Sequence, residues 1–200
     1  MRLIVGTDST WSLRAWICAY IAGLEMETQV IDLTKPDAKE QLKLMSPTGL
    51  VPALITDNNG VIHDSLAISE YVNELSGGKL LPQSESQRAE ARSLCCEMHS
   101  GFVALRTYCS FTLDKPDVDP LPMQELSSDL TRINTIFAKA RLPFMYDEPT
   151  MVDAFYAILA YRLESYGLSL HGKAVEYQRS LLEWHGLTSA IEAATEWRNG

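Results

Sequence analysis

The chain has 200 residues and a mass of 22.3 kDa, and its 46% hydrophobic and 22% charged residues are typical of a globular protein. A formal net charge of −9 repels phosphate backbones, so we expect no nucleic-acid partner. The most apolar early stretch, residues 15–22, is too short to cross a bilayer, so we expect no membrane association.

The cysteines indicate a reducing compartment. The four cysteines are Cys18, Cys95, Cys96 and Cys109, of which Cys95 and Cys96 are adjacent. They form no Cys-x-x-Cys pair and no His/Cys cluster with zinc spacing. We therefore expect reduced thiols packed as small hydrophobes, no bound metal and a cytoplasmic location.

Apolar runs and turn signals predict a small β/α domain over residues 1–76. Strands are expected at residues 3–5, 28–33, 51–56 and 61–63. Helices are expected at residues 13–22, 37–45 and 65–75. The Asn59-Gly60 turn is a strong hairpin signal, so the last two strands are predicted to be antiparallel. The order β-α-β-α-β-β-α predicts a mixed sheet with helices on its faces.

The rest of the chain predicts a linker and an all-α domain. Residues 77–84 contain Gly77, Gly78 and Pro82, a composition typical of linkers. Residues 85–200 show helical periodicity and no convincing strand. Helices are expected at about residues 86–110, 122–140, 150–163, 173–184 and 187–198. The fold class is therefore predicted to be α+β, with a β/α domain followed by a helical bundle.

Three short segments of the first domain could carry chemistry. Ser9 precedes a helix whose free N–H groups favour an anion, although a serine there can simply cap the helix. A cis bond between Val51 and Pro52 would expose main-chain groups to a ligand, whereas a trans bond at a strand edge is the alternative. Asp64 and Ser65 at a helix start could bind an ammonium and a carboxylate group, or again act only as caps.

Together these segments resemble the soluble glutathione transferases, and specifically serine-type bacterial members of that family. The resemblance covers essentially the whole chain and rests on five motifs in the family's order. They are STWSLR at 9–14, SPTGLVPAL at 46–54, DSLAISEY at 64–71, EMHSGF at 97–102 and PTMVDA at 149–154. In the last motif, Thr150 and Asp153 are expected to form a capping box at a helix start.

The resemblance implies a thioredoxin-like domain that binds glutathione and a helical domain that holds an apolar co-substrate. The implied reaction transfers the glutathione thiolate to an electrophile, as in detoxification, with glutathione as a substrate. Ser9 would donate a hydrogen bond to the thiolate without acting as a nucleophile itself. Glutathione would be held by Leu50, Val51, Pro52, Asp64 and Ser65.

The resemblance also implies a second-substrate pocket and a homodimer, the usual assembly of the family. The pocket would be formed by Trp11, His99, Phe102, Arg106 and Tyr108. On a single helix over residues 86–110, positions 99, 102 and 106 would share one face.

Two residues depart from the family's pattern. Many relatives carry Lys, Arg or Gln at the position of Leu50, where the side chain helps to hold the glycyl carboxylate of glutathione. Lys39, Lys43 or a group from the partner chain of a dimer could substitute for that residue. Asp8 replaces an aromatic or neutral residue, and its charge would work against a nearby thiolate by like-charge repulsion.

Two other functions stay open at this point. A zeta-type isomerase would use glutathione as a cofactor and return it, although this chain reads Ser9-Thr10-Trp11 where that class has Ser-Ser-Cys. A non-catalytic binding protein on the same fold is the other alternative, and the residues at positions 8 and 50 favour it.

Overall fold

The computed structural model describes residues 1–116 and 120–200, which form two compact units. The first unit consists of residues 1–80 together with 189–200, and the second of residues 81–188. The packing of residues 189–200 with the first unit was not expected from the sequence. The domain limits of 1–76, 77–84 and 85–200 stay a prediction.

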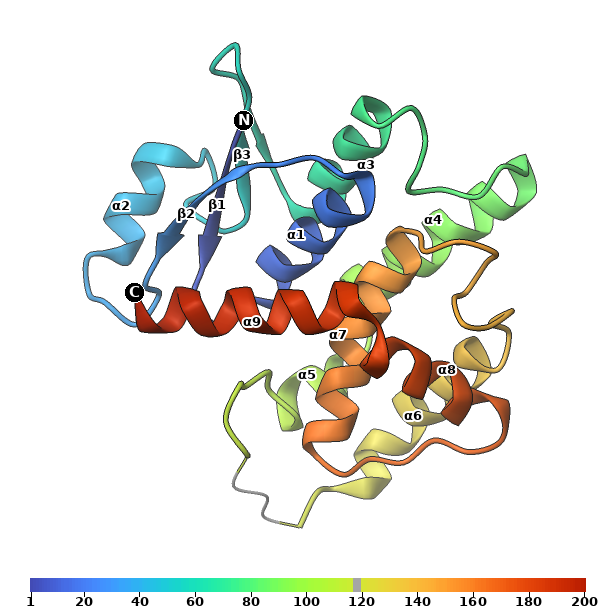
Figure 1. Ribbon diagram of the computed structural model, residues 1–200. Helices are drawn as coiled ribbons and strands as arrows, with labels where there is room; N and C mark the ends of the chain where they lie inside the picture. The colour runs from blue at the N-terminus through green and yellow to red at the C-terminus, as the bar shows by residue number, and fades with distance from the viewer. Residues whose placement is uncertain (117–119) are drawn as a thin grey trace. The chain divides into compact units, whose positions relative to one another are not determined.

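A four-stranded mixed sheet forms the centre of the first unit (Figure 1). Its strands are β1 (Arg2–Gly6), β2 (Glu27–Ile31), β3 (Ala53–Ile55) and β4 (Val61–His63), in the spatial order β2-β1-β3-β4. β1 runs parallel to β2 and antiparallel to β3, and β3 runs antiparallel to β4. This confirms the α+β class and the thioredoxin-like order of elements.

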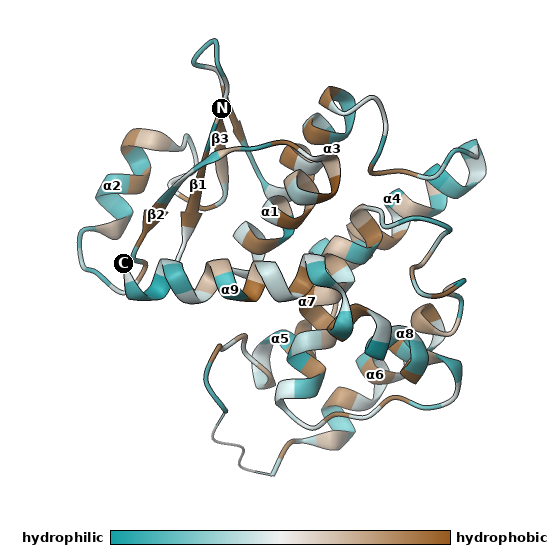
Figure 2. Cartoon of the chain, viewed as in Figure 1, coloured by the Kyte–Doolittle hydropathy of each residue, from teal (hydrophilic) through white to brown (hydrophobic). Residues whose placement is uncertain are grey.

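Helices cover both faces of this sheet. α1 (Thr10–Ala22) and α3 (Ser65–Leu75) pack against each other on one face, and α2 (Ala38–Met45) covers the other (Figure 1). Ile4 of β1 packs with Ile31, Leu42 and Ala53 on the α2 side. A strand that is covered on both faces is expected to be apolar, and Leu3, Ile4 and Val5 of β1, a strand that Figure 2 colours as hydrophobic, are almost completely buried.

Every secondary-structure element among the described residues of the second unit is a helix. It contains α4 (Glu85–Ser100), α5 (Val103–Tyr108), α6 (Met123–Phe137), α7 (Met151–Ser165) and α8 (Lys173–Glu183). α9 (His185–Asn199) begins in this unit and ends in the first. Residues 151–160 of α7 are all buried, as expected for a helix that is apolar on every side. The Tyr156 ring meets Phe102 and Phe137 edge-on, with ring centroids 6.4 and 5.8 Å apart.

The single helix predicted over residues 86–110 is wrong. α4 ends at Ser100, and Phe102 adopts a left-handed backbone with φ of 55° before α5 begins. A Cβ on Gly101 would lie 2.7 Å from the Glu97 carbonyl oxygen, so only glycine fits this break. Arg106 then donates hydrogen bonds to the carbonyl oxygens of Gly101 at 2.8 Å and His99 at 3.0 Å. The apolar residues keep their helical spacing across this break, so the sequence pattern did not reveal it. The side chain that closes the end of α4 comes from Arg106, which lies in α5.

A buried carboxylate, Asp153, organises the start of α7. Its oxygens accept hydrogen bonds from the backbone N–H groups of Thr150 and Met145, each at 2.8 Å, and from the Tyr177 hydroxyl at 2.7 Å. The Thr150 hydroxyl donates a fourth at 2.9 Å and accepts one from the Val152 N–H. This confirms the predicted capping box.

We expect Asp153→Ala to destabilise the protein by about 3 kcal/mol, because four buried donors would lose their acceptor. Denaturant unfolding measures this loss. Asp147→Ala is the matched control, because Asp147 pairs with Arg141 at 2.7 Å but its side chain is 78% exposed. Surface pairs contribute little, so the control should leave the unfolding midpoint nearly unchanged. Equal losses in both variants would contradict the central role of Asp153.

Candidate functional site

The loop between β1 and α1 holds Ser9 at a helix N-terminus. Ser9 is the N-cap of α1, and its Oγ accepts a hydrogen bond from the Ser12 N–H at 3.3 Å. Ser12 in turn accepts one from the Gly6 N–H at 3.2 Å. The expected cap is therefore present, and the same Ser9 hydroxyl can still donate its own hydrogen. Ser9 thus combines a donor with the positive end of a helix dipole.

The Val51–Pro52 bond is cis, which is the first of the two alternatives that the sequence left open. This segment lies against the end of β1. A Cβ added to Gly6 would come within 2.9 Å of a Val51 methyl carbon and 2.6 Å of a Leu33 methyl carbon. Glycine at position 6 is therefore what allows the Val51 segment to approach the loop that carries Ser9.

Asp64 and Ser65 lie at the start of α3. Asp64 is the N-cap, with φ of 74°, and its Oδ1 accepts a hydrogen bond from the Leu66 N–H at 2.8 Å. Ser65 is 2% exposed, and its buried Oγ has no hydrogen-bond partner among the described residues. A buried hydroxyl without a hydrogen-bond partner lowers the stability of the folded protein. A ligand that accepted a hydrogen bond from Ser65 would offset this loss, so Ser65 is suited to bind one.

Strand register brings these three segments to one edge of the sheet. Ile4 pairs with Ala53 and Ala53 pairs with His63. The residues that precede β3, those that follow β1 and those that follow β4 therefore share an edge. Ser9, the cis Val51–Pro52 bond and Asp64-Ser65 come to that edge from separate parts of the sequence. Leu50 also lies there, with 66% of its surface exposed.

The residues predicted for the second-substrate pocket are divided between the two units. Trp11 belongs to the first, where its ring lies 4.6 Å from the guanidinium carbon of Arg14. His99, Phe102, Arg106 and Tyr108 belong to the second. The predicted common face of positions 99, 102 and 106 is wrong, because these residues are separated by the break between α4 and α5.

Within the second unit these residues differ in exposure and bonding. Phe102 is 5% exposed and Tyr108 is 44% exposed. Arg106 closes the end of α4 through the backbone carbonyls described above. Phe102 and Arg106 therefore have structural roles in their own unit, and a role toward a second substrate stays a prediction.

Sequence reasoning missed one charged partner in the first unit. The Arg198 guanidinium donates to Asp8 Oδ1 from Nη2 at 2.7 Å and from Nε at 3.2 Å. Asp8 directly precedes Ser9 and has φ of 55°. No local signal could reveal this pair, because its members are 190 positions apart.

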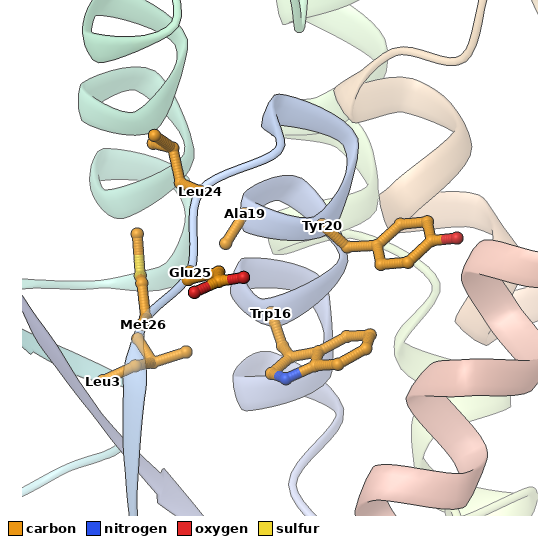
Figure 3. A pocket seen from close by; sticks show the side chains of 7 residues that line it. All are labelled: Leu3, Trp16, Ala19, Tyr20, Leu24, Glu25 and Met26. Carbon is orange, nitrogen blue, oxygen red and sulfur yellow. The ribbon is translucent and has the colours of Figure 1, made fainter.

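Pockets lie at both ends of the sheet in the first unit. One, of about 270 Å³, lies at the carboxyl ends of β1 and β2 and is lined by Thr7, Asp32, Lys35, Gln41, Trp197 and Arg198, among others. Another, of about 420 Å³, lies near the amino ends of the same strands and is lined mainly by apolar groups (Figure 3). Its Trp16 and Tyr20 rings stack with centroids 5.8 Å apart.

The buried Cys18 thiol of α1 is no candidate nucleophile. Its burial raises its pKa to about 12, and the hydrogen bond with Ser69 opposes this rise only in part. At neutral pH the thiol is protonated and unreactive.

Across residues 1–116 and 120–200, no group of three or more His, Cys, Asp or Glu side chains is arranged to hold a metal ion. None of the described helices is both long and apolar enough to span a membrane.

We expect Ser65→Ala to stabilise the ligand-free protein by up to about 1 kcal/mol, because it removes a buried hydroxyl that has no partner. Ser12→Ala is the matched control, since it removes a buried hydroxyl that accepts the Gly6 N–H. The control should lower the free energy of unfolding by about 1–2 kcal/mol. Chemical denaturation measures both. A clear loss of stability in Ser65→Ala would mean that Ser65 has a structural partner.

Comparisons with known proteins agree with this geometry. Residues 8–75 match the family model described as "Glutathione S-transferase, N-terminal domain". A stringent starvation protein A homolog from Histophilus somni is 23% identical over 162 residues, which cover 80% of this chain and 74% of that protein.

Two solved structures have the same fold over nearly the whole chain. A glutathione transferase homolog from Burkholderia with bound glutathione has a TM-score of 0.74 and 20% identity, covering 98% of this chain and 97% of its own. A bacterial maleyl pyruvate isomerase, described as a zeta-class glutathione S-transferase, has a TM-score of 0.75 and 22% identity, covering 97% and 98%. At these identities the two structures show the fold alone.

Proposed function

We propose that the chain is a member of the soluble glutathione transferase family, whose N-terminal domain model matches residues 8–75, and that it binds glutathione and transfers the glutathione thiolate to an electrophilic, apolar substrate. The observation that carries this proposal is the meeting of three segments at one sheet edge. Each offers a group suited to a different part of a γ-glutamyl-cysteinyl peptide. The glutathione bound to the Burkholderia relative supports the choice of ligand.

Ser65 and Asp64 suit the γ-glutamyl end of glutathione. The unpartnered Ser65 hydroxyl, together with the first N–H groups of α3, would donate hydrogen bonds to its carboxylate. The negative charge of Asp64 would favour its ammonium group. The Val51 backbone beside the cis-proline would pair with the cysteinyl residue as a neighbouring strand would.

The glycyl end would be held without a cationic residue at position 50. Leu50 is exposed and cannot form an ion pair, but Lys43 of α2 lies next to this segment. The Lys43 Cγ is 3.4 Å from where a Cβ on Gly49 would lie. This proximity supports Lys43 as the residue that would bind the glycyl carboxylate in place of a cation at position 50.

The chemical step depends on the acidity of the glutathione thiol. A free thiol has a pKa of about 8.5, so only a few per cent is ionised at neutral pH. The Ser9 hydroxyl and the N-terminus of α1 would stabilise the thiolate, and the thiol proton would pass to solvent. The thiolate would then attack an electrophilic carbon, forming a C–S bond while a leaving group departs or a double bond is consumed. Ser9 donates a hydrogen bond throughout and forms no covalent bond.

The remaining features of the proposal come from the family resemblance. Trp11, His99, Phe102, Arg106 and Tyr108 would contact the apolar co-substrate. A homodimer, a cytoplasmic location and a role in detoxification belong to the same proposal.

We expect Ser9→Ala to raise the pKa of the bound glutathione thiol by about one unit or more and to lower kcat/KM at least about ten-fold, because one hydrogen bond to the thiolate is lost. Ultraviolet absorbance of the thiolate measures the first effect, and conjugation of an aryl halide measures the second. Thr10→Ala is the matched control, since it removes the neighbouring hydroxyl. An unchanged thiol pKa in Ser9→Ala would exclude this role for Ser9.

Titration calorimetry with glutathione separates conjugation from its alternatives. We expect saturable binding to the wild-type protein and at least about ten-fold weaker binding to Ser65→Ala, because a hydrogen bond to a carboxylate is lost. Absence of saturable binding would favour the non-catalytic alternative. The neutral Leu50 and the similarity to a stringent starvation protein A homolog support that alternative. Glutathione binding together with cis–trans isomerisation of a substrate, but without conjugation, would favour the isomerase. The fold shared with maleyl pyruvate isomerase is the reason to include this alternative.

A further inference from the structure

The Asp8–Arg198 ion pair joins the end of α9 to the loop that carries Ser9. Both Arg198 donors reach the same oxygen, Asp8 Oδ1, at 2.7 and 3.2 Å. The two side chains are 39% and 29% exposed, so the pair is partly shielded from water. Shielding matters because ion pairs at an open surface contribute little.

The Arg198 side chain is held in place by the packing of α9. Ala190 and Ala194, which belong to the first unit, are almost completely buried, and Trp197 is 8% exposed. Arg198 therefore extends from a docked final turn rather than from a frayed end. In Figure 1 this end of α9 lies beside the carboxyl ends of β1 and β2, where Asp32 and Lys35 line the same pocket as Arg198.

The negative charge of the Asp8 carboxylate lies near the position proposed for the glutathione thiolate, which is also negative. It belongs to the residue directly before Ser9, and the loop has little freedom to move it away. The Thr7 N–H donates to the Ile31 carbonyl at 3.1 Å, and the Ser9 N–H donates to the Gly6 carbonyl at 3.3 Å. A bare carboxylate this close to Ser9 would repel the thiolate that Ser9 is proposed to stabilise.

We propose that Arg198 is a positioning residue of the glutathione site, which acts through Asp8. It neutralises the Asp8 carboxylate and fixes it on the α9 side of the loop, so that a thiolate can form beside Ser9. The inference rests on the proposed function and extends it, because it makes the last turn of α9 part of the catalytic arrangement. It also explains how the chain can carry an acidic residue at position 8.

The test is the ionisation of glutathione bound to five proteins: the wild type, Arg198→Gln, Arg198→Lys, Asp8→Asn and the double variant Asp8→Asn/Arg198→Gln. Arg198→Gln should lower the fraction of bound thiol present as thiolate about three-fold at neutral pH, because it leaves Asp8 charged and unpaired. Arg198→Lys should restore most of that fraction. The double variant should restore it as well, since it removes both charges. Asp8→Asn alone should not lower it.

The controls distinguish this charge effect from a structural one. Arg141→Gln breaks an exposed ion pair in the other unit and should leave the thiolate fraction unchanged. If the double variant is as impaired as Arg198→Gln, the arginine acts by packing and the inference is overturned. An Arg198→Gln variant that binds glutathione with an unchanged thiolate fraction overturns it too, while the proposed function stands. A wild-type protein without saturable glutathione binding overturns both.

Discussion

The close approach at Gly6 is the constraint on which the candidate site depends. A single added carbon at this position would overlap both Leu33 and Val51. Because glycine leaves that space open, the cis Val51–Pro52 segment can lie against the end of β1, and the loop that follows can turn into α1 with Ser9 at its N-cap. Larger residues would separate the two segments and move Ser9 away from the backbone groups that share its edge.

Asp153 and Ser65 are both buried polar residues, but they differ in their hydrogen-bond partners. In the second unit, Asp153 accepts four hydrogen bonds and belongs to a closed network that stabilises the start of α7. In the first unit, the Ser65 hydroxyl is buried without a partner. A protein tolerates such a cost mainly where binding later recovers it, so this contrast separates a structural polar group from one suited to a ligand.

The electrostatics of the proposed site are set by a residue from the other end of the sequence. Asp8, taken alone, argues against stabilisation of a thiolate, and it was one reason to consider a non-catalytic protein. The guanidinium of Arg198 changes that argument, because a paired carboxylate repels a neighbouring anion much less than a bare one does. Leu50 remains the feature that favours weak binding, and Lys43 is the neighbouring cation that can offset it.

The sequence by itself determined the order of the strands and helices in the first unit and the residues at several helix starts. The helix-start residues Ser9, Asp64 and Thr150 and the apolar runs of the strands all act through neighbours within a few positions, so local patterns predicted them. Only the tertiary structure decided the break at Gly101 and Phe102 and the pairing of Asp8 with Arg198. The break is closed by side-chain hydrogen bonds from Arg106, and the Asp8–Arg198 pair joins residues 190 positions apart. Neither interaction depends on the spacing of apolar residues, so helical periodicity does not record it.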